Sequence, residues 1–201
     1  MAEENTLRMS LPQQQLAAFF PMLQRGIWMR TEVGCGVMSL LTKQFGIAED
    51  YVIERITTLF LDGKPIDDLE TSYVKDGSTL ALSAAMPGLV GATMRRGGHL
   101  AAMRGSITYH SEKKQLSGTG RVKIKLFNMV MTELGAIFLA HGVCLTTGEL
   151  SVFFNEQEDS FWQSFGLAML GKQQIAPAQL KQQMNQADPD REFFLRVEFK
   201  D

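Results

Sequence analysis

The sequence predicts an α+β protein whose N-terminal part is a small mixed sheet wrapped around a single helix. Two dipeptides, Asp62-Gly63 and Asp76-Gly77, stand between extended runs, where Asp-Gly is typical of a tight reversal. The flanking residues alternate between apolar and polar, which is the period of a half-buried strand. Before these turns, apolar residues in 37–45 recur at spacings of three and four, which favours a helix that ends at Gly46.

The remaining elements follow from the same patterns. In the N-terminal part we expect strands at 6–11, 27–33, 56–61 and 79–83, and a short helix around 16–23 that Pro21 ends or distorts. In the C-terminal part we expect strands at 106–110, 120–127, 149–154 and 193–199, and helices over 129–139, 159–170 and 177–185. The segments 27–61 and 122–154 share a loose strand–helix–strand plan, but no residue string repeats.

Glycine and proline mark the expected domain boundary. After Ala85 periodicity fades, and the punctuating residues are Pro87, Gly88, Gly91, Gly97, Gly98 and Gly105. We therefore predict a first domain at 6–88, a glycine-rich basic connection at 89–105, and a second α+β portion at 106–201.

Composition narrows the functional classes. Of the 201 residues, 45% are apolar and 21% charged, and the net charge is −2. This balance is unlike that of disordered chains or strongly basic nucleic-acid binders, so no nucleic-acid partner is expected. The N-terminal residues lack a signal-peptide pattern, and the longest apolar stretch, 126–145, carries Glu133 and His141. We expect a cytoplasmic protein without membrane attachment.

The turns of the N-terminal part resemble a known family. Leu61-Asp62-Gly63-Lys64-Pro65-Ile66 is similar to the hairpin of the β-grasp (ubiquitin-like) sulfur carriers, the molybdopterin-synthase small subunit and the thiamine sulfur carrier. The run from Val74 to Leu82, with Lys75-Asp76-Gly77 before an alternating strand, resembles the next part of that family. The resemblance covers residues 6–88 and implies a β-grasp domain. It departs where the carriers end in a free Gly-Gly carboxylate, because here Gly88 is followed by more than a hundred residues.

A second glycine pair gives another hypothesis. Met94-Arg95-Arg96-Gly97-Gly98 resembles the Arg-Gly-Gly tail of ubiquitin-like modifiers. Cleavage after Gly98 would expose a carrier-type terminus, whereas an uncut chain would keep this segment as an interdomain loop.

The same region carries the candidate binding site. Between Arg95 and Lys125 there are eight basic residues and one acid, Glu112. Backbone amides of glycine-rich segments and guanidinium groups bind phosphates and carboxylates. The predicted ligand-binding residues are Arg95, Arg96, Gly97, Gly98, His99 and Arg104.

Other chemistry is not indicated by any motif. Cys35 and Cys144 do not form a CxxC pair, and neither they nor the histidines, His99, His110 and His141, stand at metal-ligand spacing. Neither a Walker nor a Rossmann glycine pattern is present, so we predict no cofactor and no metal. No catalytic residue is predicted.

Three functional hypotheses remain open. The first is a ubiquitin-like module that binds a protein partner, with strand addition at a sheet edge as one mode. The second is a binder or enzyme for a small anionic ligand that uses the basic segment 88–105. The third is a sulfur-carrier relative that lacks the free Gly-Gly terminus.

Overall fold

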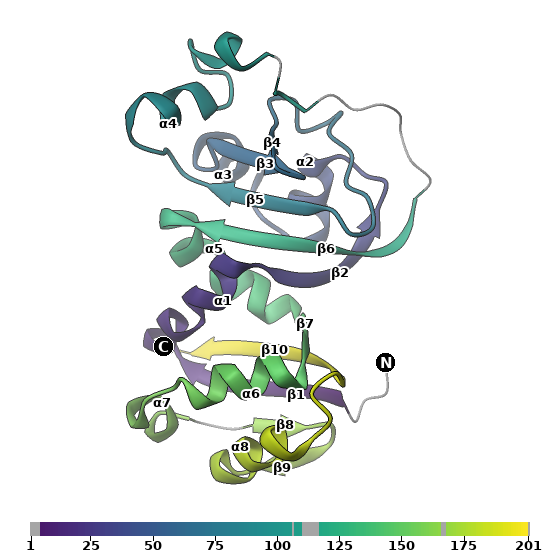
Figure 1. Cartoon of the computed structure of the whole chain (residues 1–201), viewed down its shortest axis with the longest axis vertical. Helices are drawn as coiled ribbons and strands as arrows, with labels where there is room; N and C mark the ends of the chain where they lie inside the picture. Colours follow the sequence, from purple (N-terminus) through teal and green to yellow (C-terminus); the bar gives the residue numbers. More distant parts are fainter. Residues whose placement is uncertain (1–4, 106, 110–116, 166–167, 201) are drawn as a thin grey trace. The chain divides into compact units, whose positions relative to one another are not determined.

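The computed structural model describes residues 5–105, 107–109, 117–165 and 168–200 (Figure 1). The chain divides into two compact units: unit 1 comprises 1–21 and 135–201, and unit 2 comprises 22–134. Both contain helices and strands, which confirms the α+β class. The division differs from the predicted 6–88, 89–105 and 106–201 boundaries. The N-terminal strand, Thr6–Pro12, belongs to unit 1 because it pairs with the C-terminal strand. The segment 89–105 is part of unit 2 and does not connect two domains.

Unit 2 is formed by one continuous segment, residues 22–134. Its elements are β2 (Ile27–Val33), α2 (Val37–Ser39), η3 (Leu40–Gln44), α3 (Glu49–Glu54), β3 (Thr58–Leu61), β4 (Lys64–Pro65), β5 (Thr79–Ser83), α4 (Gly88–Met94), η4 (Ala101–Arg104) and β6 (Gly118–Phe127). Two helices, α1 (Phe20–Arg25) and α5 (Asn128–His141), contain the points where the chain passes between the units.

Five strands of unit 2 lie in the order β4-β3-β5-β6-β2. The β5–β6 pair is parallel, and the three other pairs are antiparallel. The predicted turns are present: Asp62, with φ of 50°, and Gly63, with φ of 78°, join β3 to β4, and Gly77 has φ of 82° before β5. Buried side chains of one sheet face, such as Leu80 and Ile124, share the core with Leu40 and Leu41 of η3.

Unit 1 is built from both ends of the chain. Its elements are β1 (Thr6–Pro12), η2 (Gln13–Phe19), β7 (Val143–Thr146), α6 (Thr147–Asn155), α7 (Asp159–Gln163), β8 (Ala168–Leu170), β9 (Gln173–Ile175), α8 (Pro177–Gln186) and β10 (Glu192–Lys200). Its strand order is β7-β10-β1-β8-β9, with β1 and β10 parallel, so purple and yellow ribbons run together in Figure 1. Phe19, Phe153 and Phe161 form an aromatic cluster in its core.

The two units repeat one pairing pattern. In each, one strand of an antiparallel hairpin (β3–β4 or β8–β9) pairs with a central pair of parallel strands (β5–β6 or β1–β10). A further strand (β2 or β7) pairs antiparallel with the other side of that central pair. In each, the strand antiparallel to the parallel pair, β2 or β7, follows a helix and a glycine with positive φ, 106° at Gly26 and 100° at Gly142. The segments 27–61 and 122–154, which share a strand–helix–strand plan in the sequence, do not coincide with these two units. The second segment begins in β6 of unit 2 and continues into β7 of unit 1.

Several predicted elements differ from the observed ones. Residues 149–154 belong to helix α6, not to a strand, because Thr146 and Glu149 form a capping box and the buried side chains of Leu150, Phe153 and Phe154 have helical spacing. The helix predicted over 159–170 ends at Gln163 and β8 follows. A strand is predicted at 106–110, but the described residues 107–109 form no strand. Ser106 and His110 lie outside the described residues.

Candidate anion-binding pocket

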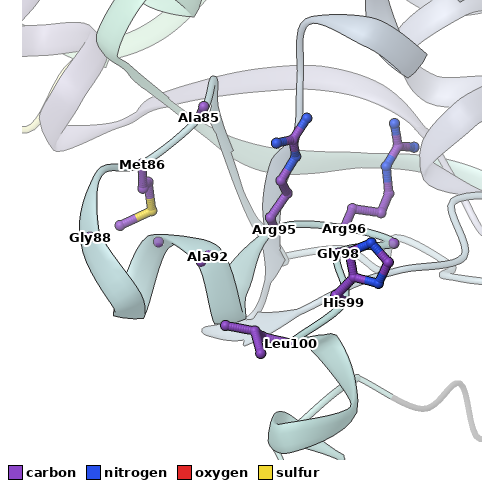
Figure 2. Close-up of a pocket in the computed structure, with 11 residues that line it drawn as sticks. Ala85, Met86, Gly88, Ala92, Arg95, Arg96, Gly98, His99 and Leu100 are labelled. Carbon is purple, nitrogen blue, oxygen red and sulfur yellow. The ribbon is translucent and has the colours of Figure 1, made fainter.

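The predicted glycine-rich basic connection forms part of a pocket in unit 2. Helix α4 begins after Pro87 and is followed by the turn Arg95–Gly98 and then by η4. A pocket of about 500 Å³ lies on this segment (Figure 2). Its lining residues are Ala85, Met86, Gly88, Gly91, Ala92, Arg95, Arg96, Gly97, Gly98, His99 and Leu100. Five of the six predicted ligand-binding residues therefore line one pocket.

Glycines allow the backbone to form this pocket. Gly91 is buried in α4, and a Cβ atom there would overlap the carbonyl oxygen of Met86, so the helix packs on the preceding turn through its bare backbone. Gly88 and Gly97 have φ of 78° and 61°, a region in which side chains with a Cβ are strained. These three positions explain why a stretch without hydrophobic periodicity still has a defined conformation.

Arg95 is the most available charge of the pocket. Its side chain is exposed, and it makes no hydrogen bond or ion pair with the residues the structure describes. Figure 2 shows the side chains of Arg95 and Arg96 extending the same way from the turn after α4, with the ring of His99 near Arg96. His99 is exposed as well. The guanidinium group of Arg95 can therefore bind an anion without breaking an existing contact.

Arg96 has a structural role in addition to lining the pocket. Its Nη2 donates to the carbonyl oxygens of Val52 at 3.1 Å and Ile53 at 2.8 Å, at the C-terminal end of α3. Burial lowers the pKa of Arg96 from its ordinary value, and the charge of Asp67 opposes that shift. A guanidinium group has five N–H donors, so Nη2 does not exhaust its capacity. Arg96 adds a second positive charge that has no carboxylate within ion-pair distance in the described chain.

Arg104 lies apart from the pocket lining. It is 3% exposed, and its guanidinium group donates to Thr93 O at 2.7 Å, Asp67 Oδ1 at 2.7 Å and Arg95 O at 3.3 Å. These bonds tie η4 to α4 and to the loop after β4. Sequence reasoning grouped Arg104 with the ligand-binding residues because charge alone does not distinguish a buried arginine from an exposed one.

Of the histidines, and of the eight basic residues counted between Arg95 and Lys125, His110, Lys113 and Lys114 lie outside the described residues. Lys123 and Lys125 lie on β6 and do not line this pocket. His141 ends α5, where its Nδ1 is 2.9 Å from Ile137 O. In the described part of the chain, no three His, Cys, Asp or Glu side chains gather as a metal site would require.

Sequence reasoning did not identify Met86 and Ala92 as lining residues, because neither carries a charge. The only available signal was their position within the glycine-rich segment. Among the described residues, no helix combines the length and apolar character needed to cross a bilayer.

Comparisons with known proteins give no match: no family model, curated protein or solved structure resembles this chain significantly.

Proposed function

We propose that the protein is a binding module, that unit 2 is a β-grasp (ubiquitin-like) domain, and that its pocket beside α4 holds an anionic group of the ligand. The single observation that carries the binding proposal is Arg95: an exposed guanidinium group, without a partner among the described residues, at a pocket lined by Gly88, Gly97 and Gly98. Carboxylates and phosphates are the groups that such a donor binds best.

The strand order of unit 2 supports the β-grasp assignment. A β-grasp domain places a helix against a small mixed sheet whose central pair is parallel, and the β4-β3-β5-β6-β2 order with α2 and η3 fits that plan. In this assignment the strand beside β2 is Gly118–Phe127, and not Thr6–Pro12, which pairs within unit 1. The domain would then span 22–134, with its first strand coming last in the sequence.

A protein partner is the expected source of the anion, and a free small molecule is the alternative. Strand addition at the β4 edge has little support, because β4 has two residues, one of them Pro65, and Pro65 O already accepts from Tyr109 N at 2.9 Å. Docking of an acidic segment at the pocket is the better supported mode.

The sulfur-carrier hypothesis has less support. Gly97 N donates to Asp67 Oδ1 at 3.2 Å, Gly98 N donates to Arg95 O at 3.2 Å, and Gly98 O accepts from Ala101 N at 2.9 Å. Such contacts favour an uncut chain, so we expect protein isolated from its native cell to contain the bond between Gly98 and His99. An intact mass that ends at Gly98 would revive the carrier hypothesis.

Titration calorimetry and thermal shift against phosphate, citrate, nucleoside phosphates and a short acidic peptide test the proposal. We expect one of these anions to bind, and Arg95→Ala to weaken it at least tenfold. The control Lys64→Ala removes an exposed charge of β4 that does not line the pocket. Absence of binding to all of them, or equal binding by Arg95→Ala, would contradict the proposal. A preference for the peptide over the free anions supports the protein partner.

A further inference from the structure

The second face of the unit 2 sheet, opposite the helices, carries aromatic and basic side chains. While Leu80, Leu82, Val122 and Ile124 are fully buried, the alternate residues of the same strands point the other way. We call this surface the open face. Its side chains are Trp28, Arg30 and Glu32 of β2, Thr58 and Phe60 of β3, Thr79, Ala81 and Ser83 of β5, and Thr119, Arg121, Lys123, Lys125 and Phe127 of β6.

All the aromatic and basic members of the open face retain solvent exposure. Arg30 and Arg121 are exposed, and Trp28, Phe60, Phe127, Lys123 and Lys125 are partly exposed. Partly exposed aromatic rings thus stand on three different strands of one sheet face, interspersed with basic side chains. Such a surface suits a ligand that brings flat rings of its own.

Two of the aromatic residues border a groove. Phe60 pairs with Ala81, and Phe127 pairs with Ser83, so the small residues of β5 lie between phenylalanines on β3 and β6. Neighbouring strands are about 4.8 Å apart, which puts the backbones of β3 and β6 roughly 10 Å apart. A pocket of about 410 Å³ lies here, with Lys125 also in its lining. This arrangement offers a flat ring a floor of small residues and an aromatic neighbour.

The third aromatic residue lies beside the lysines. The Lys123 ammonium is 5.5 Å from the centre of the Trp28 ring. Gly26 makes room for both lysine stems, because a Cβ there would lie 2.9 Å from Lys123 Cε and 2.9 Å from Lys125 Cγ. The lysine stems thus pass close to Gly26, just before β2; the Lys123 ammonium lies over the Trp28 ring, and Lys125 lines the groove.

The charge of the open face is predominantly positive. Arg30 and Arg121 are paired across β2 and β6, next to the Trp28–Lys123 pair. On these strands Glu32 is the one acid that points to this face among the described residues, and it accepts from Thr119 at 3.1 Å. Asp62 and Asp76 bind the backbone N–H groups of Thr79 and Arg121, at the turns. The face therefore suits a polyanion.

We infer that the open face of unit 2 binds single-stranded nucleic acid, with bases stacked on Trp28, Phe60 and Phe127 and phosphates at Lys123, Lys125, Arg30 and Arg121. Stacking platforms alternating with basic side chains are what a flexible strand of bases and phosphates requires. An acidic peptide would use the basic groups alone and would leave the three rings without a role. The near-neutral net charge of the chain predicts no nucleic-acid partner. The net charge, however, is a sum over the whole chain and cannot reveal that these basic side chains gather on one surface.

The test is anisotropy of fluorescein-labelled 12-nucleotide oligo(U) and oligo(dT) with the full chain at low salt. We expect saturable binding that weakens as salt rises. Lys123→Ala with Lys125→Ala should weaken binding about tenfold and reduce the salt slope by about 1.4, the value for two phosphate contacts on a single strand. Phe60→Ala with Phe127→Ala should weaken binding at least tenfold with little change in salt slope.

Two control variants distinguish binding at the open face from general attraction to a charged protein surface. Lys43→Ala with Lys64→Ala removes two charges away from the open face and should leave the affinity unchanged. In a Trp162→Phe background Trp28 is the only tryptophan, and stacking should quench its fluorescence, which tests the inference even if the phenylalanine variant fails to fold.

Three results would overturn the inference: no oligonucleotide binding, binding unaffected by the lysine variant, or equal binding of a 12-residue poly-glutamate, which would indicate an acidic protein partner. Arg95→Ala should bind oligonucleotides as the unaltered chain does, so the pocket proposal and this one fail independently.

Discussion

The ion pair between Arg104 and Asp67, 2.7 Å from Nη2 to Oδ1, joins a nearly inaccessible guanidinium group to a partly exposed carboxylate. The side chain of Arg104 is 2% exposed and that of Asp67 is 39% exposed. The same carboxylate oxygen accepts from Gly97 N at 3.2 Å. The pair therefore fastens the pocket-forming turn to the loop after β4, and it accounts for the defined conformation of a glycine-rich segment.

Arg104→Ala should destabilise unit 2 by about 2–4 kcal/mol, because it leaves the part-buried carbonyl contact of Thr93 without its donor and removes the guanidinium hydrogen bonds to Arg95 O and to the carboxylate of Asp67. Arg95→Ala is the matched control, since it removes an exposed arginine of the same segment and should change stability by less than about 0.5 kcal/mol. Urea unfolding followed by Trp28 fluorescence in the Trp162→Phe background measures both. Equal stability of the two variants would contradict the structural role of Arg104.

Gly91→Ala should deform the pocket, because its Cβ would overlap Met86 O and push α4 away from the turn before it. We expect a loss of about 1–3 kcal/mol in stability together with weaker anion binding. Gly105→Ala is the control in the same segment: its φ is −50°, and the nearest atom to a new Cβ is Ala102 O at 3.7 Å. That change should be neutral or stabilise by up to about 1 kcal/mol. Thermal unfolding of both variants, with calorimetry for the anion, distinguishes the two outcomes.

Gly142→Ala should destabilise unit 1 more than a positive φ alone explains. Gly142 has φ of 100°, and a Cβ there would overlap the ring of Phe194. Gly46 has φ of 68° with open space around it, so Gly46→Ala isolates the conformational strain, about 1–2 kcal/mol. We expect Gly142→Ala to cost about 1–3 kcal/mol beyond that. Denaturant unfolding, reported by Trp162 in a Trp28→Phe background for unit 1 and by Trp28 for unit 2, gives the comparison; equal costs would refute the ring clash.

Glu133 should contribute an acid-sensitive part of the stability of unit 2. Hydrogen bonds first from the Tyr51 hydroxyl and then from the Arg55 guanidinium lower the pKa of Glu133 below its ordinary value of 4.5. Because the folded state lowers this pKa, the contribution is complete above about pH 4.5 and is lost as the pH falls through the lowered pKa.

The variant Glu133→Gln should therefore flatten the acid limb of a stability–pH curve measured by urea unfolding, with a smaller effect at high salt. Glu54→Gln is the control, since the side chain of Glu54 makes no hydrogen bond or ion pair with the described residues. An unchanged acid limb in Glu133→Gln would show that the three-residue contact is not formed in solution.

Local patterns predicted the strands β2, β3, β5 and β6 of unit 2, but not β4, because turn chemistry and alternation act over few residues and β4 has only two. The Asp-Gly turn before β4 and the strands β2, β3 and β5 were predicted within one or two residues. Helix α6 was missed because Phe153 and Phe154 have strong strand propensity, whereas the capping box and burial on one side decided for a helix. The pocket residues were predicted in large part because charge and glycine coincide in one short segment.

By itself, the sequence determined the α+β class, the positions of the tight turns and the glycine-rich basic segment, since each depends on neighbouring residues. Only the tertiary structure decided which strands pair. Thr6–Pro12 lies beside the C-terminal strand, and Gly118–Phe127 completes the sheet of unit 2. Likewise, only the fold buried Arg104 while leaving Arg95 exposed, and only it gathered Trp28, Phe60 and Phe127 on one face. The reason is that burial and strand pairing join residues up to about 190 positions apart, and no local period records those contacts.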